Sequence, residues 1–453
     1  MDVFGSSGVR GVVNENITPT FALEVAQAAG SVLEADRVAV ARDTRATGEM
    51  LSNAAASGLA SVGCDVDCLG VIPTPGLQAY AGREGVPGVM VTASHNPPEY
   101  NGIKLIGDDG VELSRENLTA IEKRLLGGDA RRVAWDETGH TRQVTDARET
   151  YLAELATSLD REAITDADLT VAVDPGHGAG SVTSPEFFRR LGCRVVTVNA
   201  QPDGRFPGRD PEPVAENLAD LGQFVRSTGA DLGVAHDGDA DRAIFFDERG
   251  EFVSGDTALA ALTAAELDAG DTVVSAVNAS QRLVDVVDTA GATLSLTPIG
   301  STYLITRIQA LVADGEAVAV AGEGNGGIIF PAYRIARDGA YTAGRFCELL
   351  AGADRPVSDL VAPYDDYVTV RRDIYYDDER ERDAMLEAIE RVAREADADL
   401  DTTDGFRLDY GDGWTLARPS GTEPAVRIYA EARDRERAED LVGRLHGSVT
   451  DVT

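Results

Sequence analysis

The chain has 453 residues, 43% of them hydrophobic, and a formal net charge of -36 at pH 7. At about 100 to 200 residues per domain, this length predicts three or four domains. The large negative charge argues against nucleic acid and anionic membranes as partners, because both bind concentrated positive charge.

The basic residues are almost all arginine. Of 41 basic residues only Lys104 and Lys123 are lysines, and 77 acidic residues stand against them. We interpret this balance as a halophilic adaptation to a salt-rich cytoplasm, where dissolved ions shorten the range of self-repulsion. An acidic protein of an ordinary cell is the alternative.

Neither the N-terminus nor the cysteines indicate export. The first residues, MDVFGSSGVRG, have no basic start and no apolar core, and no run of about 18 apolar residues occurs in the chain. The four cysteines, Cys64, Cys68, Cys193 and Cys347, form no CxxC pair. We therefore expect a cytoplasmic protein without disulfides or a cysteine-bound metal. Cys64 and Cys68 alternate within one predicted strand and are expected to face one side as small apolar residues.

Strands and amphipathic helices alternate through most of the chain. Strands are predicted over 37–42, 64–71 and 88–93, with helices over 49–62 and 76–83. The strand pattern recurs at 168–176, 193–198 and 231–237, and again at 271–277, 292–300 and 316–324. Such alternation is typical of βαβ units. The sequence thus predicts an α/β protein with three serial α/β domains and mixed, mostly parallel sheets.

The pattern changes after residue 363. A charged helix is predicted over 378–396, followed by the short strands FRLDY, WTLAR and AVRIYAEA and a final helix near 435–448. This order favours a C-terminal α+β domain with an antiparallel sheet. The predicted domains are 1–145, 146–248, 249–363 and 364–453.

Ligands of open parallel sheets bind beyond the carboxyl ends of the strands. After the strand at 88–93 comes SHNPP, in which the turn exposes Ser94 and the pair Pro97 and Pro98 holds the backbone stiff, so that the hydroxyl points in one direction. Ser94 is therefore a candidate nucleophile. The alternative is that Ser94 only caps the turn.

Three aspartates follow the strand at 231–237. Asp237, Asp239 and Asp241 alternate along one short turn, and Arg242 comes next. Three like charges repel one another unless a cation lies between them, and an all-oxygen site favours Mg²⁺ or Ca²⁺ over zinc. The alternative is ordinary surface charge, which this composition makes common.

Two further loops carry polar groups. EGNGG, residues 323–327, follows the strand at 316–324. Near the C-terminus, hydroxyls and guanidiniums surround a glycine turn: Arg418, Ser420, Gly421, Thr422 and Arg427. Such a combination predicts a phosphate-binding cradle. Surface salt bridges are the alternative.

Six segments together resemble the alpha-D-phosphohexomutase family, which includes phosphoglucomutase, phosphomannomutase and phosphoglucosamine mutase. They occur in the family's order and span the chain: FGSSGVRG (4–11), TASHNP (92–97), NGIK (101–104), DGDADR (237–242), GEGNGG (322–327) and RPSGTEP (418–424). The resemblance implies four domains around a central cleft, and an enzyme that interconverts hexose 1-phosphate and hexose 6-phosphate.

The resemblance also implies roles for these residues. Ser94 would carry the phosphoryl group, and one Mg²⁺ would bind Asp237, Asp239, Asp241 and a phosphoserine oxygen. Arg10, Lys104 and Arg242 would lie near the transferred phosphate, while His95 would orient the serine turn. Glu323 and Asn325 would contact the sugar, and the cradle at 418–427 would hold the phosphate that is not transferred. A hexose 1,6-bisphosphate would form and turn around in the cleft.

The sugar loop departs from the family pattern at two positions. Many bacterial members have a serine and then a histidine where this chain has Asn325 and Gly327. Asn325 can still donate to and accept from a hydroxyl, but Gly327 cannot act as an acid or base, so another group must supply any proton transfer made there. Glycine-rich sugar loops of this form are similar to those of archaeal members.

Two other functions stay open at this point: a metal-dependent sugar-phosphate phosphatase in which Ser94 is incidental, and a non-catalytic sugar-phosphate binding protein. Glucose, mannose and glucosamine phosphates differ at C2, and no motif in this sequence indicates which C2 substituent is recognised. The preferred sugar and the oligomeric state are therefore open.

Overall fold

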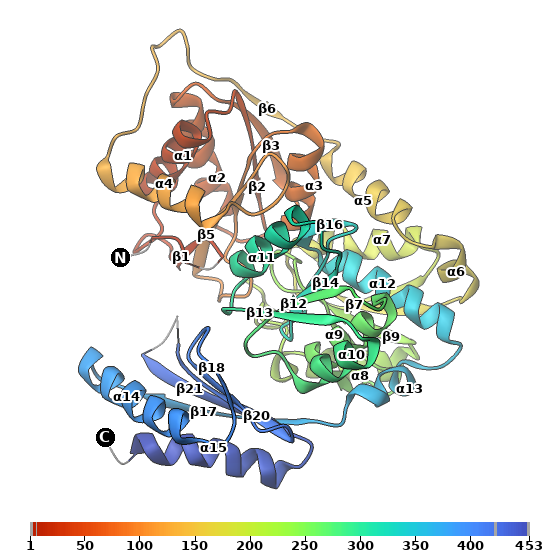
Figure 1. The fold of residues 1–453 in the computed structure, drawn as a ribbon. Helices are drawn as coiled ribbons and strands as arrows, with labels where there is room; N and C mark the ends of the chain where they lie inside the picture. The colour runs from red at the N-terminus through yellow and green to blue at the C-terminus, as the bar shows by residue number, and fades with distance from the viewer. Residues whose placement is uncertain (1–2, 6, 421–423, 451–453) are drawn as a thin grey trace.

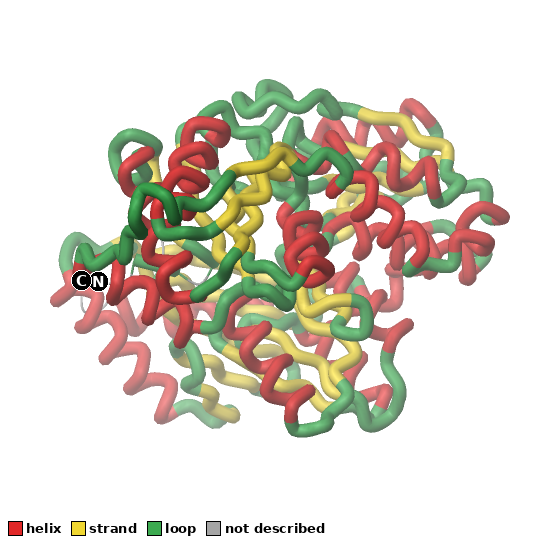
Figure 2. Tube along the Cα trace, turned by 90° about the horizontal axis from the view of Figure 1, so that it is seen from above, coloured by secondary structure: helices red, strands yellow, loops and turns green. Residues whose placement is uncertain are grey.

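The computed structural model describes residues 3–5, 7–420 and 424–450. These residues form four units in series, each built on its own sheet (Figure 1). Seen from above, the strands lie mostly inside a shell of helices and loops (Figure 2). Across the described ranges, we find no helix with both the length and the apolar character that a membrane span requires.

The first unit is a six-stranded sheet in the order β1-β5-β4-β2-β3-β6. Its strands are β1 (Val9–Val12), β2 (Arg37–Arg42), β3 (Asp65–Val71), β4 (Gly88–Val91), β5 (Tyr100–Ile106) and β6 (Thr141–Gln143). Its helices are α1 (Pro19–Leu33), α2 (Gly48–Ser61), α3 (Thr74–Glu84) and α4 (Arg115–Gly127).

Strand β2 explains why this sheet is covered on both faces. Val38 and Val40 pack into the core under α1, α2 and α4, whereas Ala39 and Ala41 face the core under α3. Successive side chains of a strand point to opposite faces, so a strand with a continuous apolar centre requires two helical layers. Cys64 and Cys68 both pack against the first of these cores, as predicted, and all four cysteines are free thiols.

The second unit has a five-stranded sheet in the order β11-β10-β9-β7-β8. Its strands are β7 (Thr170–Asp174), β8 (Arg194–Thr197), β9 (Leu232–Ala235), β10 (Ile244–Phe246) and β11 (Phe252–Val253). Its helices are α5 (Ala147–Thr157), α6 (Arg161–Asp166), α7 (Ser184–Arg190) and α8 (Ala219–Thr228), with short 3₁₀ turns at Ala179–Val182 and Ala215–Asn217. Because β11 pairs with β10, this sheet continues beyond the boundary expected after residue 248.

The third unit has a five-stranded sheet in the order β13-β12-β14-β15-β16. Its strands are β12 (Thr272–Ala276), β13 (Thr293–Thr297), β14 (Val318–Glu323), β15 (Gly327–Phe330) and β16 (Arg334–Arg337). Its helices are α9 (Gly255–Glu266), α10 (Gln281–Ala290), α11 (Ser301–Ala313), α12 (Gly339–Ala353) and α13 (Val357–Val361), followed by a 3₁₀ turn at Ala362–Tyr364.

The sheets of these three units are mixed, as predicted, but parallel pairs outnumber antiparallel pairs only in the first sheet. Their parallel pairs lie among the βαβ strands, and each sheet also carries two antiparallel pairs along one edge. The second and third units share one continuous core, in which Phe245 and Phe346 stack with ring centroids 4.3 Å apart. These two units therefore pack together as one body.

The C-terminal unit is α+β with an antiparallel sheet in the order β17-β21-β20-β19-β18, as predicted. Its strands are β17 (Val368–Tyr375), β18 (Asp399–Asp401), β19 (Phe406–Asp409), β20 (Gly413–Pro419) and β21 (Ala425–Ala432), and its helices are α14 (Glu379–Glu395) and α15 (Arg435–Thr450). The buried Glu431 on β21 accepts hydrogen bonds from Ser280 and Arg282 of the third unit. This contact fixes one end of the sheet.

Candidate active site

The serine loop lies between β4 and β5. Ser94 is 1% exposed, so the expectation of an exposed hydroxyl is wrong: the aspartate loop of the second unit packs against the turn and covers it. Ser94 adopts φ +50°, a left-handed conformation that costs a non-glycine residue about 1–3 kcal/mol unless its surroundings impose it. Its hydroxyl donates to Asp237 Oδ2 at 2.6 Å, and its amide donates to Thr92 Oγ1 at 2.9 Å. The turn therefore aims the hydroxyl of Ser94 at the aspartate loop of the second unit.

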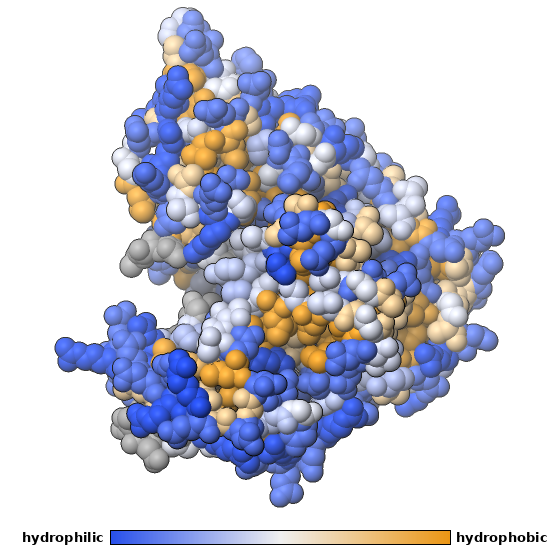
Figure 3. Space-filling view, viewed as in Figure 1, coloured by the Kyte–Doolittle hydropathy of each residue, from blue (hydrophilic) through white to orange (hydrophobic). Residues whose placement is uncertain are grey.

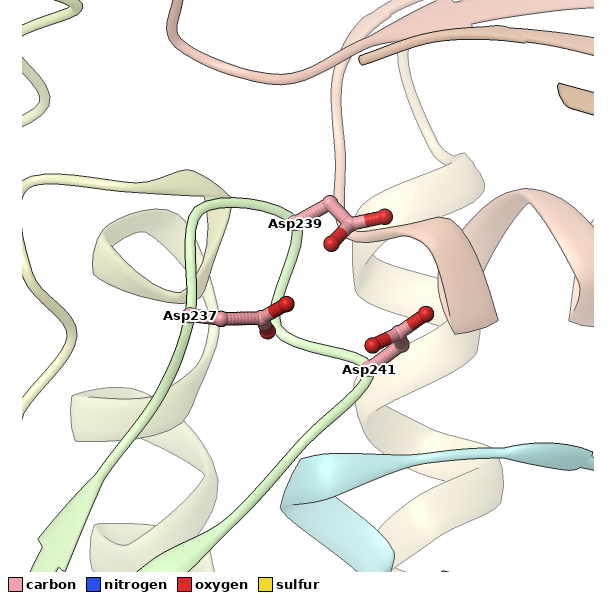
Figure 4. A group of neighbouring side chains, drawn as sticks. All are labelled: Asp237, Asp239 and Asp241. Atoms are coloured by element: carbon pink, nitrogen blue, oxygen red, sulfur yellow. The ribbon is translucent and has the colours of Figure 1, made fainter. Parts of the chain in front are cut away.

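The aspartate loop joins β9 to β10. Asp237, Asp239 and Asp241 are buried, and one carboxylate oxygen from each lies within 4.8 Å of the others (Figure 4). Oδ1 of Asp239 and Oδ1 of Asp241 are buried without a hydrogen-bond partner among the described residues. Burial, together with Asp241 and Asp239, raises the pKa of Asp237 to about 8. A bound divalent cation would coordinate these oxygens that lack hydrogen bonds and would relieve the repulsion among the carboxylates, so these residues fit Mg²⁺.

A lysine and an arginine close the other side of this cluster. Lys104, on β5, donates to Asp239 Oδ2 at 2.7 Å and to Asp241 Oδ2 at 2.9 Å. Burial disfavours its charged form, but the two carboxylates raise the pKa of Lys104, so the ammonium is charged. Arg337, at the end of β16, donates to Asp241 Oδ2 at 2.7 Å. All three α/β units thus contribute to one charged centre.

The remaining predicted catalytic residues lie beside Ser94. His95 Nδ1 is 3.4 Å from Ser94 Oγ and 3.1 Å from Nη2 of Arg242. Burial and the neighbouring guanidiniums of Arg242 and Arg10 lower the pKa of His95 to about 2, so its ring is neutral and accepts from Arg242. Arg10, on β1, donates to Asn96 Oδ1 at 3.1 Å. Two guanidiniums therefore flank the serine turn.

The sugar loop is the hairpin turn between β14 and β15. Glu323 is buried, and Asn325 Nδ2 lies 3.4 Å from its carboxylate. Asn325 also accepts from the amide of Gly327, while Gly326 accepts from the amide of Ala243 just beyond the aspartate loop. The hairpin is thus tied directly to the loop that carries the three aspartates.

The structure explains why residue 327 is a glycine. A Cβ at this position would lie 2.7 Å from Cδ of Arg337, which is closer than carbon atoms can approach without displacement. The space that a side chain at 327 would enter is therefore filled by the arginine that binds Asp241. At this departure from the family pattern, the structure brings a cation rather than an acid or base to the centre.

The predicted cradle lies at one end of the C-terminal sheet. Arg418 on β20 and Arg427 on β21 are direct cross-strand neighbours. Like charges directly opposite each other are unfavourable in a sheet, and carboxylates accompany both arginines: Asp404 pairs with Arg418, and Asp373 lies opposite Arg427 on β17. Asp404 pairs with Arg418 at 3.2 Å and accepts from the amide of Ile299 in the third unit, which holds the cradle against that unit.

Two predicted cradle residues, Gly421 and Thr422, lie outside the described residues. Ser420 is described, and its amide donates to the carbonyl of Ala425. The molecular surface is hollowed between the N-terminal and C-terminal units (Figure 3), which agrees with the expected cleft.

Four residues of this centre were not predicted from the sequence. Asp43 and Arg45 follow β2, Thr74 begins α3 after β3, and Arg337 ends β16. The hydroxyl of Thr74 donates to Asp239 Oδ2 at 2.5 Å. The signal that could have found the first three is their position after parallel strands, which is the rule that found Ser94.

Comparison with known proteins agrees with this geometry. Family models described as phosphoglucomutase/phosphomannomutase alpha/beta/alpha domains I, II and III and C-terminal domain match residues 1–132, 149–250, 254–367 and 377–446. A Thermococcus kodakarensis protein described as phosphoglucomutase/phosphomannomutase is 41% identical, over 97% of this chain and 96% of its own length.

Two further proteins are similar over nearly the whole chain. A probable phosphoglucosamine mutase of Methanopyrus kandleri is 41% identical, over 97% of this chain and 95% of its own. The crystal structure of a phosphoglucomutase/phosphomannomutase family protein from Burkholderia thailandensis superposes with a TM-score of 0.87 at 26% identity, covering 100% of this chain and 97% of that one. The chain therefore belongs to the phosphoglucomutase/phosphomannomutase family, the alpha-D-phosphohexomutases.

Proposed function

We propose that this phosphohexomutase interconverts hexose 1-phosphate and hexose 6-phosphate through a phosphoserine at Ser94 and a hexose 1,6-bisphosphate. The observation that carries the proposal is the hydrogen bond of 2.6 Å from the buried hydroxyl of Ser94 to Asp237. In the same cluster, Oδ1 of Asp239 and Oδ1 of Asp241 have no hydrogen-bond partner among the described residues. A nucleophile held against a cation site is what phosphoryl transfer requires.

Asp237, Asp239 and Asp241 would hold the Mg²⁺. When bound, this ion supplies positive charge to the phosphoryl oxygens. Lys104 contacts two of these carboxylates and Arg242 lies beside His95, so both cations are placed to stabilise negative charge that develops on the moving group.

Transfer breaks the bond between phosphorus and Ser94 Oγ and forms a bond between phosphorus and the oxygen of a sugar hydroxyl. The sugar hydroxyl loses one proton and Ser94 Oγ gains one, so the step releases no net proton. The neutral His95 accepts from Arg242 and so orients that guanidinium rather than titrating. After transfer, the bisphosphate turns around and returns its other phosphate to Ser94. The remote cradle must therefore accept either phosphate, which suits the generic anion contacts of Arg418 and Arg427.

The sugar itself is a narrower question. Glu323 and Asn325 present a carboxylate and an amide on one short hairpin, and both can bond to sugar hydroxyls. We propose glucose, mannose or glucosamine phosphate as the substrate. Named relatives include both a phosphoglucomutase/phosphomannomutase and a probable phosphoglucosamine mutase, which supports this range.

A kinetic comparison tests the function. The purified protein, with Mg²⁺ and a trace of hexose 1,6-bisphosphate, is assayed with glucose 1-phosphate, mannose 1-phosphate and glucosamine 1-phosphate. We expect at least one 6-phosphate product, no net release of inorganic phosphate, and stimulation by the bisphosphate. Steady release of inorganic phosphate without isomerisation would establish a phosphatase instead.

The cradle gives a further prediction. A charge-assisted hydrogen bond contributes about 1.5–3 kcal/mol, so Arg427→Ala should raise KM for the sugar phosphate by about one to two orders of magnitude. The matched control is Arg394→Ala on α14, which removes an exposed arginine of the same unit that pairs with Glu390 on the helix surface. Initial rates against substrate concentration measure both.

The same measurement tests the halophilic interpretation. Because the Debye length falls to about 3 Å at 1 M salt, repulsion from the net charge of -36 should fade while contact in the cradle persists. We expect the wild-type KM to fall or stay level as salt rises to molar concentration. If the wild-type KM climbs steeply with salt and the KM of the Arg427 variant equals that of wild type, residues 418–427 are not the phosphate-binding cradle.

A further inference from the structure

Arg45 is a buried arginine that holds the serine loop by its main chain. Its side chain is 0% exposed and lies just after β2. Its guanidinium N–H groups donate to five acceptors at 2.6 to 3.1 Å: Asp43 Oδ2 and the carbonyl oxygens of Ser94, Asn96, Pro97 and Tyr100. A guanidinium has five N–H donors in a fixed plane, so every donor is used.

These bonds act on the backbone that presents the nucleophile. Residues 94–100 curve around the guanidinium, and four of their carbonyls accept from it. A second chain of bonds supports the same turn: the amide of Ser94 donates to Thr92, whose hydroxyl donates to Asp43, which also accepts from Arg45. The left-handed φ of Ser94 is therefore imposed from both sides by one aspartate–arginine pair.

Residues of the second unit pack against Arg45 and the serine loop. The ring of Phe206 lies 5.1 Å from the guanidinium carbon of Arg45, and Gly204 forms a bridge with the backbone of Arg45. On the aspartate loop, a Cβ at Gly238 would lie 2.5 Å from the carbonyl oxygen of Ser94. The carbonyl that Arg45 binds is thus also the point where the serine loop and the aspartate loop touch.

We propose that Arg45 is a positioning residue for phosphoryl transfer, which sets the direction of the Ser94 hydroxyl through the carbonyls of residues 94–100. This inference rests on the proposed function. A fully buried guanidinium must satisfy all five of its N–H donors, and the ion pair with Asp43 uses only one of them. Four further donors directed at one loop indicate a geometric role, and lysine, with three donors, cannot reproduce it.

The test uses Arg45→Lys and Arg45→Ala in the full chain. A nucleophile displaced by about 1 Å can cost 10²-fold in rate, so we expect kcat to fall about 10²-fold in Arg45→Lys. KM should be unchanged, because Arg418 and Arg427 bind the remote phosphate. In Arg45→Ala, guanidinium ion below denaturing concentration should restore part of kcat, whereas sodium chloride at the same concentration should not.

The matched control is Arg142→Lys. Arg142 also pairs with a buried aspartate of the first unit, Asp67, but its side chain is 60% exposed and its described hydrogen bonds go to Asp67 rather than to the serine loop. We expect this variant to keep wild-type kcat. Hydrogen exchange of the amides in 94–100 should be faster in Arg45→Lys than in wild type and unchanged in Arg142→Lys.

Several results would overturn the proposal. They are a wild-type kcat in Arg45→Lys, an equal loss of kcat in Arg142→Lys, and no rescue by guanidinium of a folded Arg45→Ala. If Arg45→Ala does not fold, the lysine variant and its exchange rates decide. A wild-type protein without mutase activity would refute the proposed function, while the exchange of residues 94–100 would still report whether Arg45 orders the loop.

Discussion

Ser94→Ala is expected to abolish mutase activity. A mutase that begins from a sugar monophosphate must already hold the second phosphoryl group, and Ser94 is the hydroxyl that the structure holds against the aspartate cluster, 2.6 Å from Asp237. Intact mass of the active wild type should show a subpopulation heavier by one phosphoryl group. That subpopulation and the activity should both be missing from the variant.

The control for this prediction is Ser57→Ala. Ser57 is exposed on α2, and its hydroxyl donates within its own helix to the carbonyl of Asn53. This variant should keep both the activity and the heavier species. Full activity in Ser94→Ala, with a fold that matches wild type by circular dichroism, would end the phosphoserine hypothesis.

Asp239→Asn is expected to have the second largest effect. The substitution removes one negative charge from a site built on three, and it weakens the contact with Lys104 at 2.7 Å. Changes around a bound metal typically cost 10–100-fold in affinity or activity, so the Mg²⁺ concentration for half-maximal rate should rise by at least about tenfold. Turnover at saturating Mg²⁺ should also fall, because Lys104 loses a partner that orients it.

An isosteric control separates the site from general surface charge. Asp220→Asn, in the exposed first turn of α8, removes the same charge from the same unit. Its Mg²⁺ titration should match wild type. If Asp239→Asn gave the wild-type titration as well, the three aspartates would not be the metal ligands.

Much of the architecture follows from local pattern. Strands with a continuous apolar centre, such as β2 and β7, have central side chains buried on both faces, and their spacing by helices predicts layered α/β units. Strand β5 was not predicted, because YNGIKLI contains asparagine and glycine, which are depleted in strands. It forms a strand because it pairs with β4 and β1 on either side.

Some residues of the candidate site could likewise be predicted from local sequence, and others could not. Ser94 and the three aspartates could be found from sequence because each motif is contiguous and follows a parallel strand, where ligands bind. Their properties can be inferred from neighbouring residues alone, because alternate carboxylates repel one another and prolines keep a turn rigid. Each of these properties depends only on residues a few positions apart.

Tertiary structure alone decided which loops meet. Thr74 and Lys104 reach Asp239 across 165 and 135 residues of sequence, and Arg337 fills the space beside Gly327. Arg45 binds main-chain carbonyls, which every residue has, so no sequence pattern marks its partners. Hydrogen bonds form only when distant elements are packed to within about 3 Å, and that placement is a property of the assembled fold rather than of any segment.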